Sequence, residues 1–159
     1  MVFSLRMVGT TLSRPSPRWR LSAEARDTGG MSEGYLEILR EMYGQESLSA
    51  GLALAHPEVE LHQAREIPDT DDYVGRDDVL RGSLRWIEEW DDFRFHPGEM
   101  IDVGARVLLR VRVTGRAKAS GIEFDQTAFH LWTFRDGLPW RLDVYMGERE
   151  AREAAGLSE

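Results

Sequence analysis

The chain has 159 residues, of which 42% are hydrophobic and 30% are charged, and it contains no cysteine. This length suits one globular domain, and no stretch reaches the roughly 18 to 20 consecutive apolar residues that a membrane-spanning helix needs. The lack of cysteine excludes disulfides, thiolate nucleophiles and thiolate metal sites. We therefore expect a soluble, single-domain, cytoplasmic protein that does not associate with membranes.

The net charge of −8 is unevenly distributed along the chain. Residues 1–30 hold five arginines against two acidic residues, whereas residues 31–159 hold 26 acidic and 15 basic residues. An acidic domain repels the phosphate backbone of nucleic acids, so we expect no nucleic-acid partner.

The first 30 residues have no sustained helical or strand periodicity. They include the proline- and serine-containing run 13–17 and end in the pair Gly29-Gly30. These features favour a disordered N-terminal extension at 1–30, followed by a folded domain at 31–159.

The first half of the domain predicts three helices. Ser32 suits the N-cap of a helix that ends at Gly44, and a second short helix is expected over 47–55, because the residue before a proline disfavours helix. The segment 75–78 begins a third helix with two acidic residues in its first turn, and apolar residues at helical spacing continue to Trp90.

Strand-like alternation dominates the second half. Phe93 begins a strand that Pro97 and Gly98 interrupt, which is typical of a bulged or edge strand. Further strands are predicted over 58–62, 106–114, 122–134 and 139–146, with a short helical turn over 151–155. The dipeptide Asp136-Gly137 predicts a tight hairpin turn between the last two strands.

Helices followed by hairpin-connected strands indicate the α+β class. We expect a cone-shaped, curved, largely antiparallel sheet with about three helices packed on its concave face. The parity of the alternation directs Val107, Val111 and Val113 inward, together with Leu142 and Val144.

Three segments occur in a suggestive order: Tyr73–Asp77 before a tryptophan-bearing helix, then Phe129–Gly137, then Arg141–Tyr145. In this order they resemble the SnoaL-like proteins of the nuclear-transport-factor-two-like superfamily, over nearly all of 31–159. The resemblance, which extends to ketosteroid isomerases and polyketide cyclases, implies a pocket for a small hydrophobic molecule. It also implies a homodimer formed through the outer face of the sheet.

The resemblance leaves the function open among three alternatives. One is a cofactor-free isomerase, cyclase or lyase that acts by proton transfer. The others are a non-catalytic ligand-binding module and a dimeric interaction module that uses Leu108, Phe129, Leu131 and Tyr145 on the outward parity. Epoxide hydrolases of the limonene type place an arginine and two aspartates where this chain has Val111, Val113 and Val144, so that chemistry is disfavoured.

Two histidines are candidate catalytic residues. His130 shares the inward parity of its strand with Trp132 and could act as an acid, a base or an anchor for a ligand oxygen. His62 lies on the first strand, where Glu60 or Gln63 could orient it, although a solvated outer face is the alternative for these residues.

Large aromatic residues from different elements, together with inward valines, are the candidate ligand-binding residues, since such side chains enclose flat apolar ligands. The predicted set is Tyr35, Tyr43, Trp86, Trp90, Val111, Val113, Trp132 and Val144. A purely structural role in the core is the alternative for each of them.

No cofactor is expected. The four histidines are scattered without a metal-ligand spacing, and the glycines do not form a phosphate-binding loop. We therefore predict neither a metal nor a nucleotide.

Overall fold

The computed structural model describes residues 30–67 and 71–157. The predicted disordered extension lies outside these ranges, apart from Gly30, which begins the first helix. The elements in chain order are α1 (Gly30–Tyr43), α2 (Leu48–Leu52), β1 (Glu60–His62), β2 (Tyr73–Val74), α3 (Arg76–Ile87), β3 (Trp90–Asp102), β4 (Arg106–Ala117), β5 (Glu123–Arg135), β6 (Leu138–Tyr145) and α4 (Glu148–Ala154).

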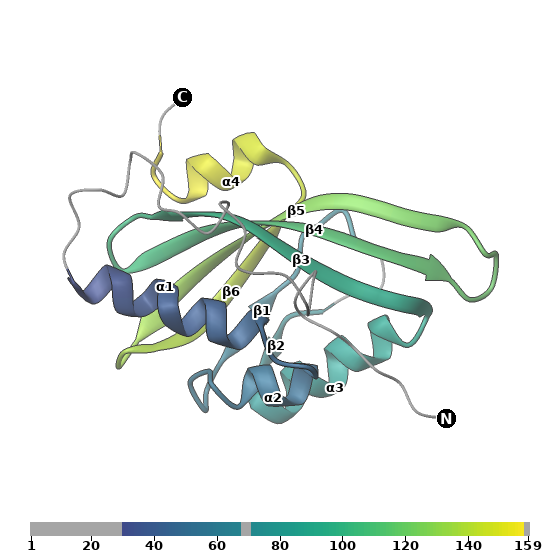
Figure 1. The fold of residues 1–159 in the computed structure, drawn as a ribbon, viewed down its shortest axis with the longest axis horizontal. Helices are drawn as coiled ribbons and strands as arrows, with labels where there is room; N and C mark the ends of the chain where they lie inside the picture. The colour runs from purple at the N-terminus through teal and green to yellow at the C-terminus, as the bar shows by residue number, and fades with distance from the viewer. Residues whose placement is uncertain (1–29, 68–70, 158–159) are drawn as a thin grey trace.

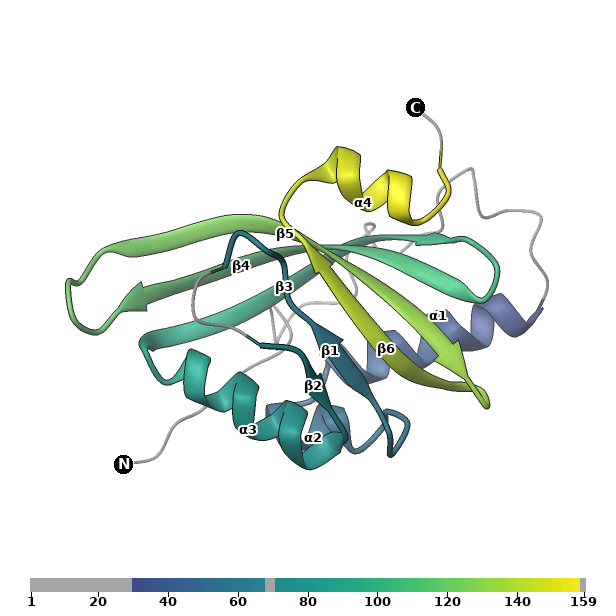
Figure 2. The ribbon, with the colours of Figure 1, turned by 180° about the vertical axis from the view of Figure 1, so that it is seen from behind.

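The strands of the described residues form one six-stranded sheet in the order β2-β1-β6-β5-β4-β3. All neighbouring strands are antiparallel except β1 and β6, which are parallel. The sheet is strongly curled, with α1, α2 and α3 on one side and α4 on the other (Figure 1). Figure 2 shows the same two layers from behind. The α+β class and the three helices on the concave face are confirmed.

The helices differ from the prediction mainly at their ends. α1 begins at Gly30, so Ser32 lies within the helix and is not its cap. Ser47 caps α2 as its Oγ accepts a hydrogen bond from the N–H of Ala50 at 3.0 Å. α2 ends at Leu52, earlier than predicted. After it, the N–H groups of Leu54 and Ala55 bond to carbonyls three residues earlier, and not four as in an α-helix.

Trp90 does not extend α3, contrary to the prediction. Instead it begins β3 and pairs with Ala117. The carbonyl of Glu89 accepts a hydrogen bond from the N–H of Lys118 at 3.0 Å, so a contact distant in sequence draws the chain out of the helix.

The strands follow the predicted alternation. β3 is an edge strand with register shifts between Asp91 and Arg94 and between Pro97 and Met100, as its proline and glycine indicate. Asp136 and Gly137 join β5 to β6 with positive φ angles of 54° and 78°, which is the geometry of a type I′ hairpin turn.

Two apolar clusters lie on opposite faces of the sheet. The larger one joins α1, α2 and α3 to the concave face. The smaller one packs α4 against the convex face, where Leu108, Phe129 and Leu131 are all at most 6% exposed. Arg106 fastens the end of α4 by donating to the carbonyls of Ala154 and Ala155 at 2.9 and 3.2 Å.

The position of α4 corrects the predicted dimer surface. Of the four outward residues expected to contact a second copy, Leu108, Phe129 and Leu131 are buried within the chain, and only Tyr145 is partly exposed. The sequence pattern predicted a helical turn over 151–155, but it did not predict that this turn packs on the convex face of the sheet. A homodimer through the outer face stays a prediction, without these three side chains.

Candidate functional site

A cavity of about 390 Å³ lies between the concave face of the sheet and α1, α2 and α3. This volume is within the range of roughly 300 to 1,000 Å³ that ligand sites occupy. The sheet contributes small and medium apolar side chains to it, namely Val113, Ala128, Leu142 and Val144. Their inward direction follows from the strand alternation that the sequence predicts.

Aromatic rings form one continuous wall of the cavity. Trp86 lies 5.1 Å from Phe93 between ring centroids, and Phe93 lies 5.2 Å from Phe95, both edge to face. Trp90 joins this row through Trp86 at 5.9 Å. The row reaches His130, whose ring lies 5.8 Å from that of Phe95. An apolar ligand would therefore contact ring surfaces along the path to His130.

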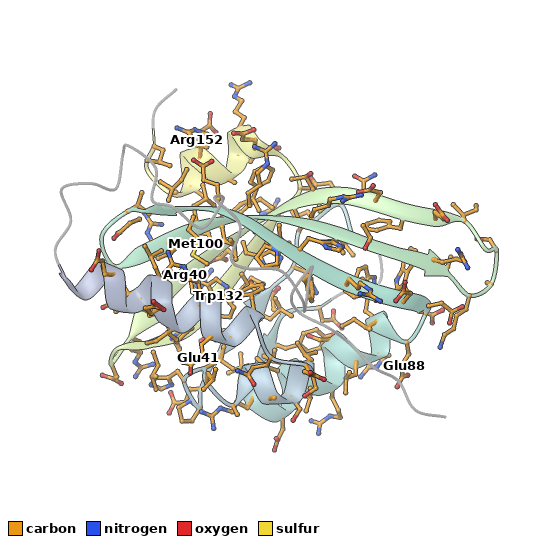
Figure 3. The ribbon with its side chains drawn as sticks, in the orientation of Figure 1. Arg40, Glu41, Glu88, Met100, Trp132 and Arg152 are labelled. Carbon is orange, nitrogen blue, oxygen red and sulfur yellow. The ribbon has the colours of Figure 1, made fainter. Side chains whose placement is uncertain are left out.

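Three side chains form a buried hydrogen-bonded row at the concave face. The Nε1–H of Trp132 donates to the hydroxyl oxygen of Tyr43 at 2.9 Å, and this hydroxyl lies 2.6 Å from Nδ1 of His130. Figure 3 shows Trp132 on the α1 side of the sheet and Arg152 on α4 on the opposite side. No other described group accepts a hydrogen bond from the Tyr43 hydroxyl, so we assign its proton to the bond with Nδ1, which places the proton of His130 on Nε2.

Burial holds both titratable members of this row in their neutral forms. Desolvation lowers the pKa of His130 to about 4, and it raises the pKa of Tyr43 well above its ordinary value, against the hydrogen bond from Trp132. At neutral pH the row therefore presents an uncharged N–H. No described residue hydrogen-bonds to Nε2 of His130, which lines the cavity.

The low pKa of His130 predicts a loss of stability in acid. Between the folded value of about 4 and the ordinary value of 6.5, the unfolded chain binds the proton and the folded chain does not. The stabilisation is complete above the ordinary value and is lost as the pH falls towards 4. From about pH 7.5 to about pH 5, the free energy of unfolding should fall by roughly 2 kcal/mol more than in His130→Gln. Urea unfolding at both pH values measures this, and equal losses in the two proteins would contradict it.

Most of the predicted site residues line this cavity. They are Tyr43, Trp86, Trp90, Val113, His130, Trp132 and Val144. Tyr35 and Val111 do not line it: Tyr35 stacks on Phe134 with centroids 3.9 Å apart, and Val111 is fully buried in the core. The binding roles of all the predicted residues stay predictions, and for Tyr35 and Val111 this cavity does not support them.

His62 borders a different cavity from His130. It lines a more polar space of about 590 Å³ together with Asp72 and Asp143, so the two candidate catalytic histidines do not converge on one point. The Nε2 of His62 lies 2.9 Å from Glu60, the partner expected from the sequence, and Nδ1 lies 3.0 Å from Asp72. Both ring nitrogens of His62 therefore face carboxylates.

Five polar residues line the main cavity in addition to His130. Glu60 and Gln63 were expected only as partners of His62, and Glu66, Ser83 and Gln126 were missed by the sequence reasoning. Their presence depends on how α3 and the segment after β1 fold over the open end of the sheet, which alternation within a strand does not report. The inward parity that gave Ala128 and His130 also includes Gln126, and this was the available signal.

Two further features were sought among the described residues, a metal-binding group and a membrane-spanning helix. Within 30–67 and 71–157, no group of three or more histidine, aspartate or glutamate residues is arranged to hold a metal ion. In the same ranges no helix is long and apolar enough to cross a membrane.

Comparison with known proteins identifies the fold and the family of the chain. No functionally curated protein matches it. A solved structure of an NTF2-like protein from Burkholderia thailandensis E264 is 19% identical, with a TM-score of 0.61 over 80% of this chain and 95% of that one. A candidate SnoaL-like polyketide cyclase from Jannaschia sp. CCS1 is 14% identical, with a TM-score of 0.64 over 84% and 99%.

A third solved structure, TerC co-crystallised with polyporic acid, is 18% identical, with a TM-score of 0.56 over 77% of this chain and 92% of that one. At these identities the three likenesses establish the fold alone. The family model of the SnoaL-like domain matches residues 36–142, which is more than half of the chain. The chain therefore belongs to the SnoaL-like domain family.

Proposed function

We propose that this domain binds a small, largely apolar molecule in the cavity beneath α1, α2 and α3, and that the Nε2–H of His130 donates a hydrogen bond to an oxygen of that molecule. One observation carries the proposal: the row Trp132, Tyr43, His130 ends on Nε2, which has no hydrogen-bond partner among the described residues, in a largely apolar cavity. A hydrogen bond from this nitrogen to a ligand oxygen contributes about 1 kcal/mol to the stability of the complex.

Binding is favoured over a His130–His62 acid–base mechanism by the arrangement of the two rings. His130 uses its Nδ1 lone pair to accept from Tyr43, so its free nitrogen is a donor and not a base. His62, the expected second group, borders the other cavity. The cavity volume also counts against a pure interaction module, for which a void far below the range of ligand sites is expected.

The test uses 2-acetylnaphthalene, a neutral aryl ketone, with quenching of tryptophan fluorescence as the readout. Trp86 and Trp90 line the cavity and report its occupancy. We expect stoichiometric, saturable binding by the native protein. Absence of binding by this ketone and by other neutral aryl ketones would contradict the proposal.

Two substitutions of one residue separate the donor from the acceptor of the imidazole. His130→Asn retains an acceptor near the position of Nδ1 for Tyr43 but removes the donor, whereas His130→Gln retains a donor near the position of Nε2. We expect the affinity for the ketone to fall about tenfold in His130→Asn and less in His130→Gln, since one hydrogen bond contributes about 1 kcal/mol. The reverse order would contradict the role of Nε2.

Glu60 supports a second candidate function, proton transfer at a carbon next to the bound carbonyl. Glu60 lines the main cavity, its side chain is 23% exposed, and it bonds to His62 at 2.9 Å. A carboxylate oriented in this way can remove an acidic proton while His130 polarises the carbonyl. Deuterium exchange into the ketone, followed by NMR, tests this candidate; exchange should depend on Glu60 and be lost in Glu60→Gln.

A further inference from the structure

We infer that the cavity selects its ligand by charge: it accepts an uncharged molecule and rejects the carboxylate of the same size and shape. The inference rests on the proposed function and deepens it, because the proposal above specifies only an apolar molecule with an oxygen acceptor. The charged and polar groups that the described residues contribute to the cavity support it.

The described lining contains no lysine or arginine. Its only ionised side chains are two carboxylates, Glu60 and Glu66, and both repel an anion that approaches through the open end. The chain as a whole carries a net charge of −8, which adds to this repulsion at low salt. Nothing in the described part of the cavity therefore compensates a buried negative charge.

The buried donors do not replace a cation. The N–H of Trp132 and the O–H of Tyr43 are already used within the row, so a ligand that reaches the row meets the Nε2–H of His130. The other donors that the described residues contribute to the lining are all uncharged, and they belong to Gln63, Ser83, Trp86, Trp90 and Gln126. The ring of His130 is neutral at physiological pH, since burial holds its pKa at about 4. Neutral donors satisfy a carbonyl oxygen, but they do not supply the positive charge that a buried carboxylate needs as a partner.

The aromatic wall that adjoins the row is equally unsuited to an anion. Aromatic rings carry negative charge on their faces, and Trp86, Phe93 and Phe95 form a continuous row along the cavity. Burial of a carboxylate against them without a counter-ion costs several kcal/mol, which corresponds to a loss in affinity of about 100-fold or more.

The experiment compares 2-naphthamide with 2-naphthoate, which share one skeleton and differ in charge, by isothermal titration calorimetry at about pH 7.5 and at two salt concentrations. We expect the full-length protein to bind the amide at least about 100-fold more tightly than the carboxylate. The difference should narrow only slightly as salt rises, because the buried part of the penalty is not screened.

A charge-swapped pair of variants tests the cause of this selectivity. Gln126 is an exposed residue of β5 that lines the cavity, and Thr127, the next residue, points to the opposite face. Gln126→Arg adds a guanidinium to the cavity and should lower the amide-to-carboxylate ratio about tenfold. Thr127→Arg adds the same charge on the other face and should leave the ratio at the wild-type value.

The possible failures are distinguishable. If the carboxylate binds within about threefold of the amide, selection by charge is wrong and the proposed binding function stands. If neither naphthalene nor the aryl ketone binds, the proposed function fails, and the inference fails with it. If Gln126→Arg and Thr127→Arg change the ratio equally, the cavity lining is not the source of the selectivity.

Discussion

Replacing Tyr43 with phenylalanine is expected to lower the free energy of unfolding by roughly 2 to 4 kcal/mol, because it strands two buried polar groups at once. The hydroxyl of Tyr43 accepts from Trp132 at 2.9 Å and lies 2.6 Å from Nδ1 of His130. All three side chains are at most 5% exposed, so water does not readily replace the missing oxygen. Urea denaturation followed by circular dichroism measures the change.

Tyr35→Phe is the matched control for this substitution. Tyr35 lies on the same helix, its ring stacks on Phe134 with an interplanar angle of 10°, and no described residue hydrogen-bonds to its hydroxyl. Removal of this hydroxyl should change stability by less than about 0.5 kcal/mol. Equal losses in the two variants would show that loss of any tyrosine hydroxyl from α1 is responsible, and not loss of the row.

Tyr43→Phe should also alter the distribution of the proton between the two ring nitrogens of His130. In the native protein Nδ1 accepts from Tyr43, which fixes the proton on Nε2. Tyr43→Phe removes this constraint, so ¹⁵N chemical shifts of the ring should move from one tautomer towards a mixture. Spectra that remain unchanged would contradict the assignment of Tyr43 as the donor.

Local periodicity explains why the sequence located most of the candidate site. On β4, β5 and β6 the alternation of side chains is fixed by the backbone, so Val113, His130 and Val144 could be directed to the concave face before the fold was known. The contact of Trp132 with the same face follows from its spacing of two from His130. None of these placements required knowledge of how the strands pair.

Tyr35 and Val111 have the predicted orientation but do not line the cavity, because of their position along the helix and their depth in the core. Tyr35 and Tyr43 share one face of α1 but are eight residues apart, which is roughly 12 Å along the helix axis. Tyr43 reaches the cavity, and Tyr35 instead covers Phe134 near the turn between β5 and β6. Val111 has the predicted parity, but it is 0% exposed, belongs to the core cluster and does not line the cavity.

Contacts between distant segments could not be derived from the sequence. Asp72 reaches His62 because β2 pairs with β1, and a two-residue strand gives almost no alternation signal. The separation of His62 from His130 likewise depends on the parallel pairing of β1 with β6, which aligns His62 with Asp143. Parallel pairing of a short strand has no local signature in the sequence.

The placement of α4 on the convex face leads to the second large prediction. Ala151 is 0% exposed and belongs to the cluster that holds α4 against Ile101, Leu108 and Leu131. Ala151→Glu introduces a carboxylate into this contact, so α4 should detach and stability should fall by roughly 2 to 4 kcal/mol. The uncovered patch is apolar, and such patches associate. We therefore expect the variant to form larger species than the native protein does under the same conditions as its concentration rises, measured by size-exclusion chromatography with light scattering.

Arg149→Ala is the control for α4, since it changes the net charge by the same one unit at a residue whose side chain is 81% exposed. It removes only the ion pair with Glu153 and should stay within about 0.5 kcal/mol of the native stability. If Ala151→Glu has the same free energy of unfolding and the same elution volume as the native protein, α4 is not the element that keeps the patch covered. If the variant loses stability but associates no more than the native protein, α4 covers the patch but the patch is not an association surface. Exposure of Leu108, Phe129 and Leu131 is then not enough to join further copies.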